Sequence, residues 1–221
     1  MEGHNCVDLA FISHGHNDHG NGIKTFLQLN STSPIYIHKN AFDAHSARIA
    51  FFHADIGLDR TLLESSQPVL TDENTEHIEE GLELFSAIKG SKLMPPSNKR
   101  LYAKENGIRA QDDFKHEQHL VITDNKNTVL ICGCAHKGII NIIEEFKAKK
   151  GFYPSHVVGG LHLKKARKKF LKNLSVHLIA SKIKFYTCHC TGLKSYSLLK
   201  ELMNEQIEYI SAGSILEIKD F

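Results

Sequence analysis

Residues 14–19 place three histidines and one aspartate within six positions, directly after the apolar run Val7–Ser13, which predicts a buried strand. The four polar residues are His14, His16, Asp18 and His19. His14 and His16 are two positions apart, so in extended backbone both side chains point the same way and can bind one metal ion. Asp18 and His19 follow at the turn into a predicted helix and can reach a second ion. Imidazole and carboxylate ligands suit zinc first, with iron or manganese as alternatives.

A polar, glycine-rich turn that caps a helix is the other interpretation of this segment. For a lone histidine that interpretation would be preferred. Four ligand-type residues in the order His-x-His-x-Asp-His favour a metal site, and they account for part of the unusual total of 15 histidines.

Two further polar segments follow predicted strands and contain histidine. GCAHKG follows Thr128–Cys132, and TCHCTG follows Ile183–Thr187. Each leads through glycine into a predicted helix, Ile139–Lys150 in the first case and Lys194–Asn204 in the second. Because strand ends at one edge of a sheet converge in space, we expect these segments to share one site with the first cluster.

The segment SHGHNDHG resembles the His-x-His-x-Asp-His signature of the metallo-β-lactamase superfamily. Together with DDFKHEQHLVI, ICGCAHKGIINII, VVGGLHL and YTCHCTG, it is similar to one subfamily. These are metal-dependent hydrolases related to the archaeal dihydropterin-aminobenzene-ribofuranosyl-phosphate synthase of methanopterin biosynthesis. The resemblance extends from about Cys6 to about Leu216.

The resemblance implies an αββα sandwich with a dinuclear metal site at the edge between its sheets. His14 and His16 would bind one metal, Asp18 and His19 the other, and two more histidines would complete the ligand shell. These two are His136 and His189.

Three positions near the implied site differ from the superfamily pattern or match it less closely. A bridging aspartate normally follows glycine near His136, whereas Gly133 is followed here by Cys134. The bridge is therefore the Cys134 thiolate, a water molecule, or absent. The middle histidine of the superfamily falls near HEQ, which makes His116 or Glu117 a candidate ligand. His162 of GGLHL is expected to contact substrate.

The implied activity is metal-dependent hydrolysis of a phosphoester or of an acyl or cyclic small molecule. Two ions lower the pKa of a shared water and yield hydroxide. We expect Asp18 to hold its metal and orient this nucleophile, and His162 to donate a hydrogen bond or a proton to substrate. A pterin-phosphate transferase is the second enzymatic interpretation, and a non-catalytic protein that binds metal or a partner is the third.

Superfamily members normally have several strands before the histidine motif, and this chain starts almost at the motif. The resemblance therefore implies a sandwich that lacks its N-terminal strands and exposes a sheet edge. Either the chain is a truncated product or it covers this edge by forming a homodimer.

Composition and the order of predicted elements limit the fold class and the kinds of partner. The mixed order of strands and helices predicts an α/β or α+β fold, and the absence of linkers or repeats predicts one domain over residues 1–221. A net charge of +2 does not predict nucleic-acid binding, and no apolar stretch approaches the ~20 residues of a membrane span. Five cysteines without a signal peptide predict a reducing cytoplasm rather than a disulfide framework.

Two other features admit more than one interpretation. Cys132, Cys134, Cys188 and Cys190 could form a structural zinc site, although Cys-x-Cys spacing is unusual for one. The basic run KKARKKF, residues 164–170, could bind phosphate or nucleic acid, but a solvated helix face is preferred. Core or surface roles are expected for the histidines without a motif, which are His38, His45, His53, His77, His156 and His177.

The remaining secondary structure is predicted more coarsely. Residues 41–65 have weak helical character, and an irregular stretch is expected from GSKLMPPSNKR to about Lys115. DNKN is expected to be the turn of a hairpin. The other predicted strands are Pro34–His38, Leu82–Ile88, His119–Thr123, His156–Val158, Ile207–Ile210 and Ser214–Ile218.

Overall fold

The computed structural model describes residues 7–74, 77–105, 107–124 and 127–218, which form two compact units. The first unit comprises residues 1–75 and 100–118, and the second comprises residues 76–99 and 119–221. The prediction of one domain over residues 1–221 stays a prediction. No helix in the described ranges is long and apolar enough to cross a membrane.

The first unit contains a three-stranded parallel sheet with the order β1-β2-β5. The strands are β1 (Ala10–Ile12), β2 (Ile35–His38) and β5 (Pro68–Thr71). Its helical segments are α1 (Asn17–Gly20), α2 (Ile23–Leu29), η1 (Lys39–Phe42) and η2 (Arg60–Glu64). Ile35 and Ile37 are fully buried and pack with Ile23 and Phe42, so α2 and η1 cover this sheet. β2 agrees with prediction, whereas β1 is shorter than the predicted Val7–Ser13.

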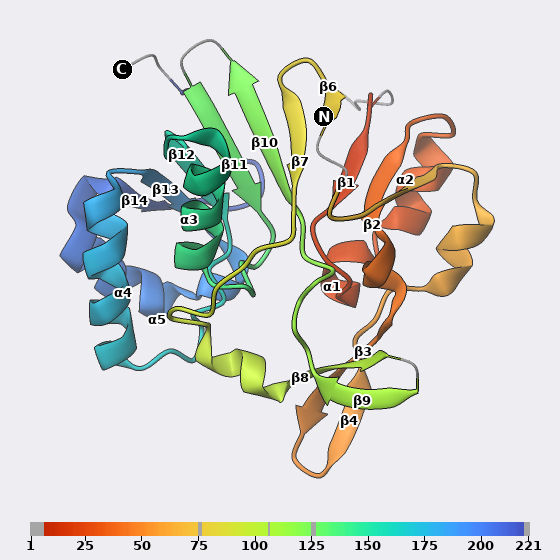
Figure 1. Ribbon diagram of the computed structural model, residues 1–221, viewed down its shortest axis with the longest axis horizontal. Coiled ribbons are helices and arrows are strands. Elements are labelled where there is room, and N and C mark those ends of the chain that lie inside the picture. The colour runs from red at the N-terminus through yellow and green to blue at the C-terminus, as the bar shows by residue number, and fades with distance from the viewer. Residues whose placement is uncertain (1–6, 75–76, 106, 125–126, 219–221) are drawn as a thin grey trace. The chain divides into compact units, whose positions relative to one another are not determined.

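A second sheet in the first unit is antiparallel, with the order β4-β3-β8-β9 (Figure 1). Its strands are β3 (Ala44–Ile49), β4 (Phe52–Asp55), β8 (Leu101–Glu105) and β9 (Ile108–Gln111). The predicted helical character of residues 41–65 is therefore wrong for β3 and β4 and holds only for the short helix η2 and the end of η1. The stretch to Lys115, predicted to be irregular, contains β8 and β9. These strands are largely exposed and lack apolar alternation, and β3 pairs with β8 from a distant part of the sequence. No local pattern could indicate such a pairing.

The second unit is built on a seven-stranded mixed sheet with the order β14-β13-β12-β11-β10-β7-β6 (Figure 1). Parallel pairing joins β11 through β14, and antiparallel pairing joins β11, β10, β7 and β6. The strands are β6 (His77–Glu79), β7 (Leu82–Phe85), β10 (His119–Asp124), β11 (Asn127–Cys132), β12 (His156–Gly159), β13 (Lys184–Thr187) and β14 (Ile207–Tyr209). The predicted hairpin of β10 and β11 is confirmed, while the centre of its turn lies outside the described residues.

Three α-helices of the second unit pack against this sheet through one apolar cluster. They are α3 (Ile139–Lys150), α4 (Lys168–Ser181) and α5 (Leu193–Met203), with the short helices η3 (Pro96–Arg100), η4 (His189–Thr191) and η5 (Asn204–Gln206). The apolar periodicity predicts the observed bounds of α3. In contrast, α4 begins only at Lys168, so the first part of the basic run 164–170 is not the helix face that was predicted. The predicted strand Ser214–Ile218 is wrong, because this segment forms no strand and leaves Ile215 exposed.

Candidate metal centre

The histidine turn of the first unit begins where β1 ends. His14 and His16 are buried, and their ring centroids lie 4.7 Å apart. The His19 ring, from the first turn of α1, lies 4.1 Å from the His14 ring. The Asp18 carboxylate is about half exposed and lies 3.7 Å from Nε2 of His19. The four predicted ligands of this unit thus lie on one short turn, with three imidazoles grouped together.

Gly15 lets the turn pass close to its neighbours. A Cβ atom at this position would lie 2.4 Å from the carbonyl oxygen of Ala41 and 2.8 Å from Nε2 of His45. The amide N–H of Gly15 donates to Nδ1 of His116 over 2.9 Å. The backbone between the two predicted ligands His14 and His16 is therefore fixed both sterically and by a buried hydrogen bond.

Gln118 joins the ends of three strands beneath the turn. Its amide nitrogen Nε2 donates to the carbonyl oxygens of Ile12 in β1 and Tyr36 in β2, at 2.9 and 3.2 Å. Its Oε1 accepts from Thr71 Oγ1 of β5 at 2.6 Å, and its backbone N–H donates to Ser13 at 2.8 Å. One buried amide side chain therefore fixes the strand end from which the histidines project.

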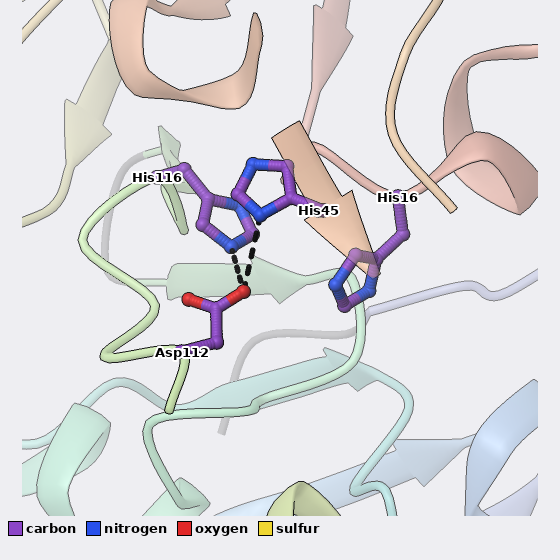
Figure 2. A group of neighbouring side chains, drawn as sticks. All are labelled: His16, His45, Asp112 and His116. Carbon is purple, nitrogen blue, oxygen red and sulfur yellow. Dashed lines mark hydrogen bonds and ion pairs between the residues drawn. The ribbon is translucent and has the colours of Figure 1, made fainter. Parts of the chain in front are cut away.

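Asp112 lies at the centre of a buried hydrogen-bond group (Figure 2). Its Oδ2 faces Nδ1 of His45 at 3.1 Å and Nε2 of His116 at 3.3 Å. Its Oδ1 accepts from the backbone N–H of Phe114 at 2.8 Å. Because Nδ1 of His116 accepts from Gly15, Nε2 carries the proton that His116 donates to Asp112. The carboxylate is thus connected through His116 to the histidine turn.

The electrostatics agree with this proton arrangement. Burial opposes ionisation of Asp112, but the hydrogen bonds from His116 and His45 hold its pKa well below the usual range. Burial also lowers the pKa of His116, which favours the neutral ring that accepts from Gly15. Burial lowers the pKa of His38, at the end of β2, to about 4, so this ring is neutral at pH 7.

The chemistry of the donors in the first unit fits a divalent transition metal. His16, His45, Asp112 and His116 each offer a ligand atom, and these atoms lie within 4.8 Å of one another. Three imidazoles and one carboxylate suit zinc, iron or manganese. Both nitrogens of His116 take part in hydrogen bonds here, so its geometry is that of a residue that supports the turn. Glu117 is fully buried, and its backbone N–H donates to Phe114.

The three remaining motifs lie together in the second unit, as predicted for strand ends. GCAHKG, GGLHL and TCHCTG follow β11, β12 and β13, whose final residues pair in register as Cys132, Gly159 and Thr187. The side chain of Cys134 is buried at their centre. Its Sγ lies within 4.8 Å of a ligand atom of each residue in a group of four: His136, His162, His189 and Cys190.

Asn98 of η3 holds His136 from two sides. Its Nδ2 donates to the His136 carbonyl at 2.7 Å, and its Oδ1 lies 3.3 Å from Nδ1 of the His136 ring. A proton on Nδ1 donates to this oxygen, so the lone pair lies on Nε2, the tautomer that metal-binding histidines use. The ring of His162 lies 4.2 Å from that of His136.

Cys190 is held against Cys134 and His162. The backbone N–H of His162 donates to Cys190 Sγ at 3.2 Å, and Gly160 leaves space for that sulfur, since a Cβ there would lie only 2.5 Å away. The hydrogen bond with the Cys134 thiol, assisted by His162, lowers the pKa of Cys190 to about 5 against the effect of burial. Nδ1 of His162 is buried and makes no hydrogen bond to the described residues.

The four-cysteine zinc alternative is wrong for this geometry. Among the described residues, no group of neighbouring ligand atoms includes Cys132 or Cys188. Cys132 is instead a buried member of the apolar cluster, and burial raises the pKa of Cys188. None of these four cysteines forms a disulfide with a described residue.

Four residues that position the predicted ligands have no ligand-type spacing in the sequence. They are His45, Asn98, Asp112 and Gln118. Asp112 and Gln118 lie within or directly beside the quoted segment DDFKHEQ, which was the available signal, whereas His45 and Asn98 have no motif context.

None of the protein-family models matches the sequence. The chain is 27% identical over 227 aligned residues to 7,8-dihydropterin-6-methyl-4-(beta-D-ribofuranosyl)-aminobenzene-5'-phosphate synthase of Methanocaldococcus jannaschii, covering 96% of this chain and 75% of the synthase. It is 28% identical to the uncharacterized protein MJ0448 of the same organism, covering 96% and 78%. Among solved structures it is similar to Tm1679, a metal-dependent hydrolase of the β-lactamase superfamily, with a TM-score of 0.80 and 27% identity over 95% of this chain and 79% of that one.

Proposed function

The chain has the metallo-β-lactamase fold, and from this premise we propose that it is a metal-dependent hydrolase acting on a phosphoester or on an acyl or cyclic small molecule. The observation that carries the proposal is the turn at the end of β1, where the rings of His14, His16 and His19 are grouped. Imidazole is the commonest side-chain ligand of divalent transition metals, so three rings grouped on one short turn suit such an ion.

The proposed metal ligands are the six residues of the resemblance. They are His14, His16, Asp18, His19, His136 and His189. Cys134 is a further candidate, supported by its central thiol among the motifs of the second unit. His116 and Glu117 are weaker candidates, since both ring nitrogens of His116 already contact protein groups. When bound, two divalent ions, zinc in the first instance, would supply a hydroxide at neutral pH and stabilise negative charge on the substrate.

Side chains of the protein would orient the attacking water and donate a proton to the substrate. The Asp18 carboxylate, about half exposed beside His19, is able to accept a hydrogen bond from the attacking water. His162 has a buried Nδ1 without a hydrogen-bond partner among the described residues, so it is able to exchange a hydrogen bond or a proton with substrate. The backbone of His162 is in the left-handed region, with φ of 51°, a strained conformation that is enriched at functional sites.

A pterin-phosphate transferase is the second candidate, favoured by the similarity to the methanopterin-pathway synthase. A pterin phosphate supplied with an arylamine acceptor separates the two activities. Both reactions release the phosphate group, so the pterin product distinguishes them. The transferase would yield the pterin joined to the amine, whereas the hydrolase would yield the pterin alcohol. We also propose that the protein acts in the cytoplasm, where the four described thiols stay reduced, and that its substrate is a small molecule. A homodimer stays a prediction.

The test is metal content by elemental analysis, combined with turnover of a phosphoester panel. We expect about two ions per chain for a dinuclear site. His16→Ala and Asp18→Ala should each lose bound metal and turnover. His77→Ala, on the exposed strand β6, is the matched control and should keep both. Full activity in His16→Ala or Asp18→Ala would overturn the assignment, and a folded wild-type chain without metal would favour a non-catalytic, partner-binding protein.

A further inference from the structure

The second unit contains a cavity of about 710 Å³ that none of the motifs uses. It is formed by η3 and by the segment that leads into α4. Pockets that bind small ligands have volumes of about 300–1,000 Å³. The cavity is therefore large enough for a nucleotide-sized molecule.

Four basic side chains line this cavity, and no acidic residue does. They are Lys99, Lys165, Arg167 and Lys169. None of the four forms an ion pair with any described residue. The whole chain carries a formal charge of only +2, so this is a local concentration of uncompensated positive charge. Such a surface attracts an anion, and it does so more strongly than an isolated surface lysine.

The start of α4 adds to this field. Arg167 is the N-cap residue, its side chain makes no capping hydrogen bond, and the first turn contains no acidic residue. The first backbone N–H groups of any helix lack intrahelical partners and carry partial positive charge. The basic run of residues 164–170 is thus not a solvated helix face throughout. Its first half is a loop beside the cavity, and its second half begins the helix.

Apolar groups provide the rest of the lining. Phe170 is half-buried and packs against the main apolar cluster of the unit, and Pro96 lines the cavity with it. A held aromatic ring beside a proline offers a flat apolar surface on which another ring can pack. Phosphate or another dianion would suit the basic side, and a planar ring would suit this side.

The same short helix connects the cavity to the histidines. Pro96 and Lys99 of η3 line the cavity, while Asn98 between them holds His136. Ser97 Oγ lies 3.4 Å from the carbonyl oxygen of His162. A ligand in the cavity would therefore contact the helix that orients a proposed metal ligand and the proposed proton donor.

We propose that this cavity binds a phosphorylated small molecule with an aromatic ring, the phosphate lying against the basic side chains and the ring against Phe170. That this molecule is the substrate rests on the proposed function, whereas its binding does not. An uncharged analogue gains nothing from the four cations and is therefore expected to bind more weakly.

The test is calorimetric titration of the metal-free protein with phenyl phosphate and with phenol as the uncharged analogue. We expect phenyl phosphate to bind and phenol not to bind. The double variant Lys165→Ala/Lys169→Ala should weaken binding at least about tenfold, since hydrogen bonds to charged groups are lost. Lys172→Ala removes an exposed lysine of the same helix outside the cavity and should bind as the wild type does. Added salt should weaken the interaction.

Three results would overturn the proposal: equal binding of phenyl phosphate and phenol, equal loss in Lys172→Ala and the double variant, or tighter binding of a single-stranded oligonucleotide than of phenyl phosphate. Failure of the proposed function has a different signature. If the metal-free protein binds phenyl phosphate, but the purified protein contains no metal and hydrolyses no phosphoester, the proposed cavity site is supported and the proposed hydrolase activity is overturned. If phosphoesters are hydrolysed and the double variant changes neither their KM nor the binding of phenyl phosphate, the hydrolase stands and the proposed cavity site is overturned.

Discussion

Replacing Asp112 by asparagine tests whether this carboxylate holds the histidine turn in place. Asparagine keeps the volume but offers one acceptor oxygen and one NH₂ donor. If the oxygen accepts from the backbone N–H of Phe114, the NH₂ group faces the N–H of His116 and Nδ1 of His45. If the amide is reversed, the NH₂ group faces the Phe114 N–H instead. Neither orientation satisfies all of the groups that the carboxylate binds.

The expected loss is large because all of the partners are buried. Side chains of Asp112, His45 and His116 are 0 to 1% exposed. Hydrogen bonds to a charged group contribute about 1.5–3 kcal/mol each, and removing one member of a buried pair costs about 3–5 kcal/mol. We therefore expect Asp112→Asn to lower the free energy of unfolding by about 3–5 kcal/mol. Since His116 also holds Gly15, the variant should lose bound metal as well.

The assay is urea unfolding followed by circular dichroism at pH 7, with metal content measured on the same samples. Asp113→Asn is the matched control, because this neighbouring carboxylate is exposed. A surface substitution of this kind changes stability by no more than about 0.5 kcal/mol. The reasoning is refuted if the two variants unfold within 0.5 kcal/mol of each other, or if Asp112→Asn keeps all of its metal.

Three further predictions concern single positions. His119 is buried, makes no hydrogen bond to the described residues through either ring nitrogen, and has a pKa that burial lowers to about 3. The unfolded chain takes up a proton at this histidine near pH 6.5, whereas the folded chain does not. The free energy of unfolding should therefore fall as the pH drops from 6.5 towards 3, by about 2 kcal/mol at pH 5. His119→Leu should reduce this pH dependence, as measured by urea unfolding at pH 7 and pH 5. Gly15→Ala should lose metal and lower the urea midpoint of unfolding, because the new Cβ would lie 2.4 Å from the Ala41 carbonyl oxygen. Gly22→Ala is the control and should resemble the wild type, because no atom lies within 4 Å of a Cβ at that position. Equal behaviour of the two variants would contradict the steric argument. His116→Asn retains an acceptor at the position of Nδ1 and should keep the wild-type metal count, whereas a folded His116→Asn protein with one ion fewer would make His116 a ligand.

The parts of the fold that could be predicted are those with a local pattern. The buried strands of the second unit are short apolar runs, and α3 has apolar residues on its inner face. The antiparallel sheet of the first unit has neither signal. β9 is exposed along its whole length, and β3 pairs with a strand more than fifty positions away. Its stability comes from that distant pairing, so no window of sequence contains the information.

The residues of the candidate site also divide into those that a local pattern predicts and those that it does not. A motif identifies ligand-type residues by their mutual spacing, which is why His14 and His16 could be proposed as ligands from the sequence. Supporting residues have no fixed spacing, since they approach the site from other elements. Asn98 reaches His136 from a helix 38 positions earlier, and Gln118 bonds Ile12 across 106 positions. Only the folded backbone shows which amide or carboxylate does this.

The ring nitrogens separate the histidines by what each is able to do. A ligand must keep one nitrogen for the metal, so a protein group should hold only the other. His14 uses Nδ1 towards Ser13 and His136 uses Nδ1 towards Asn98, which is the arrangement that the proposed role of each as a metal ligand requires. His45 and His116 use both nitrogens on protein groups, which suits support and not coordination. These histidines therefore fit two tasks, the proposed binding of metal and the fixing of the turn that would bind it.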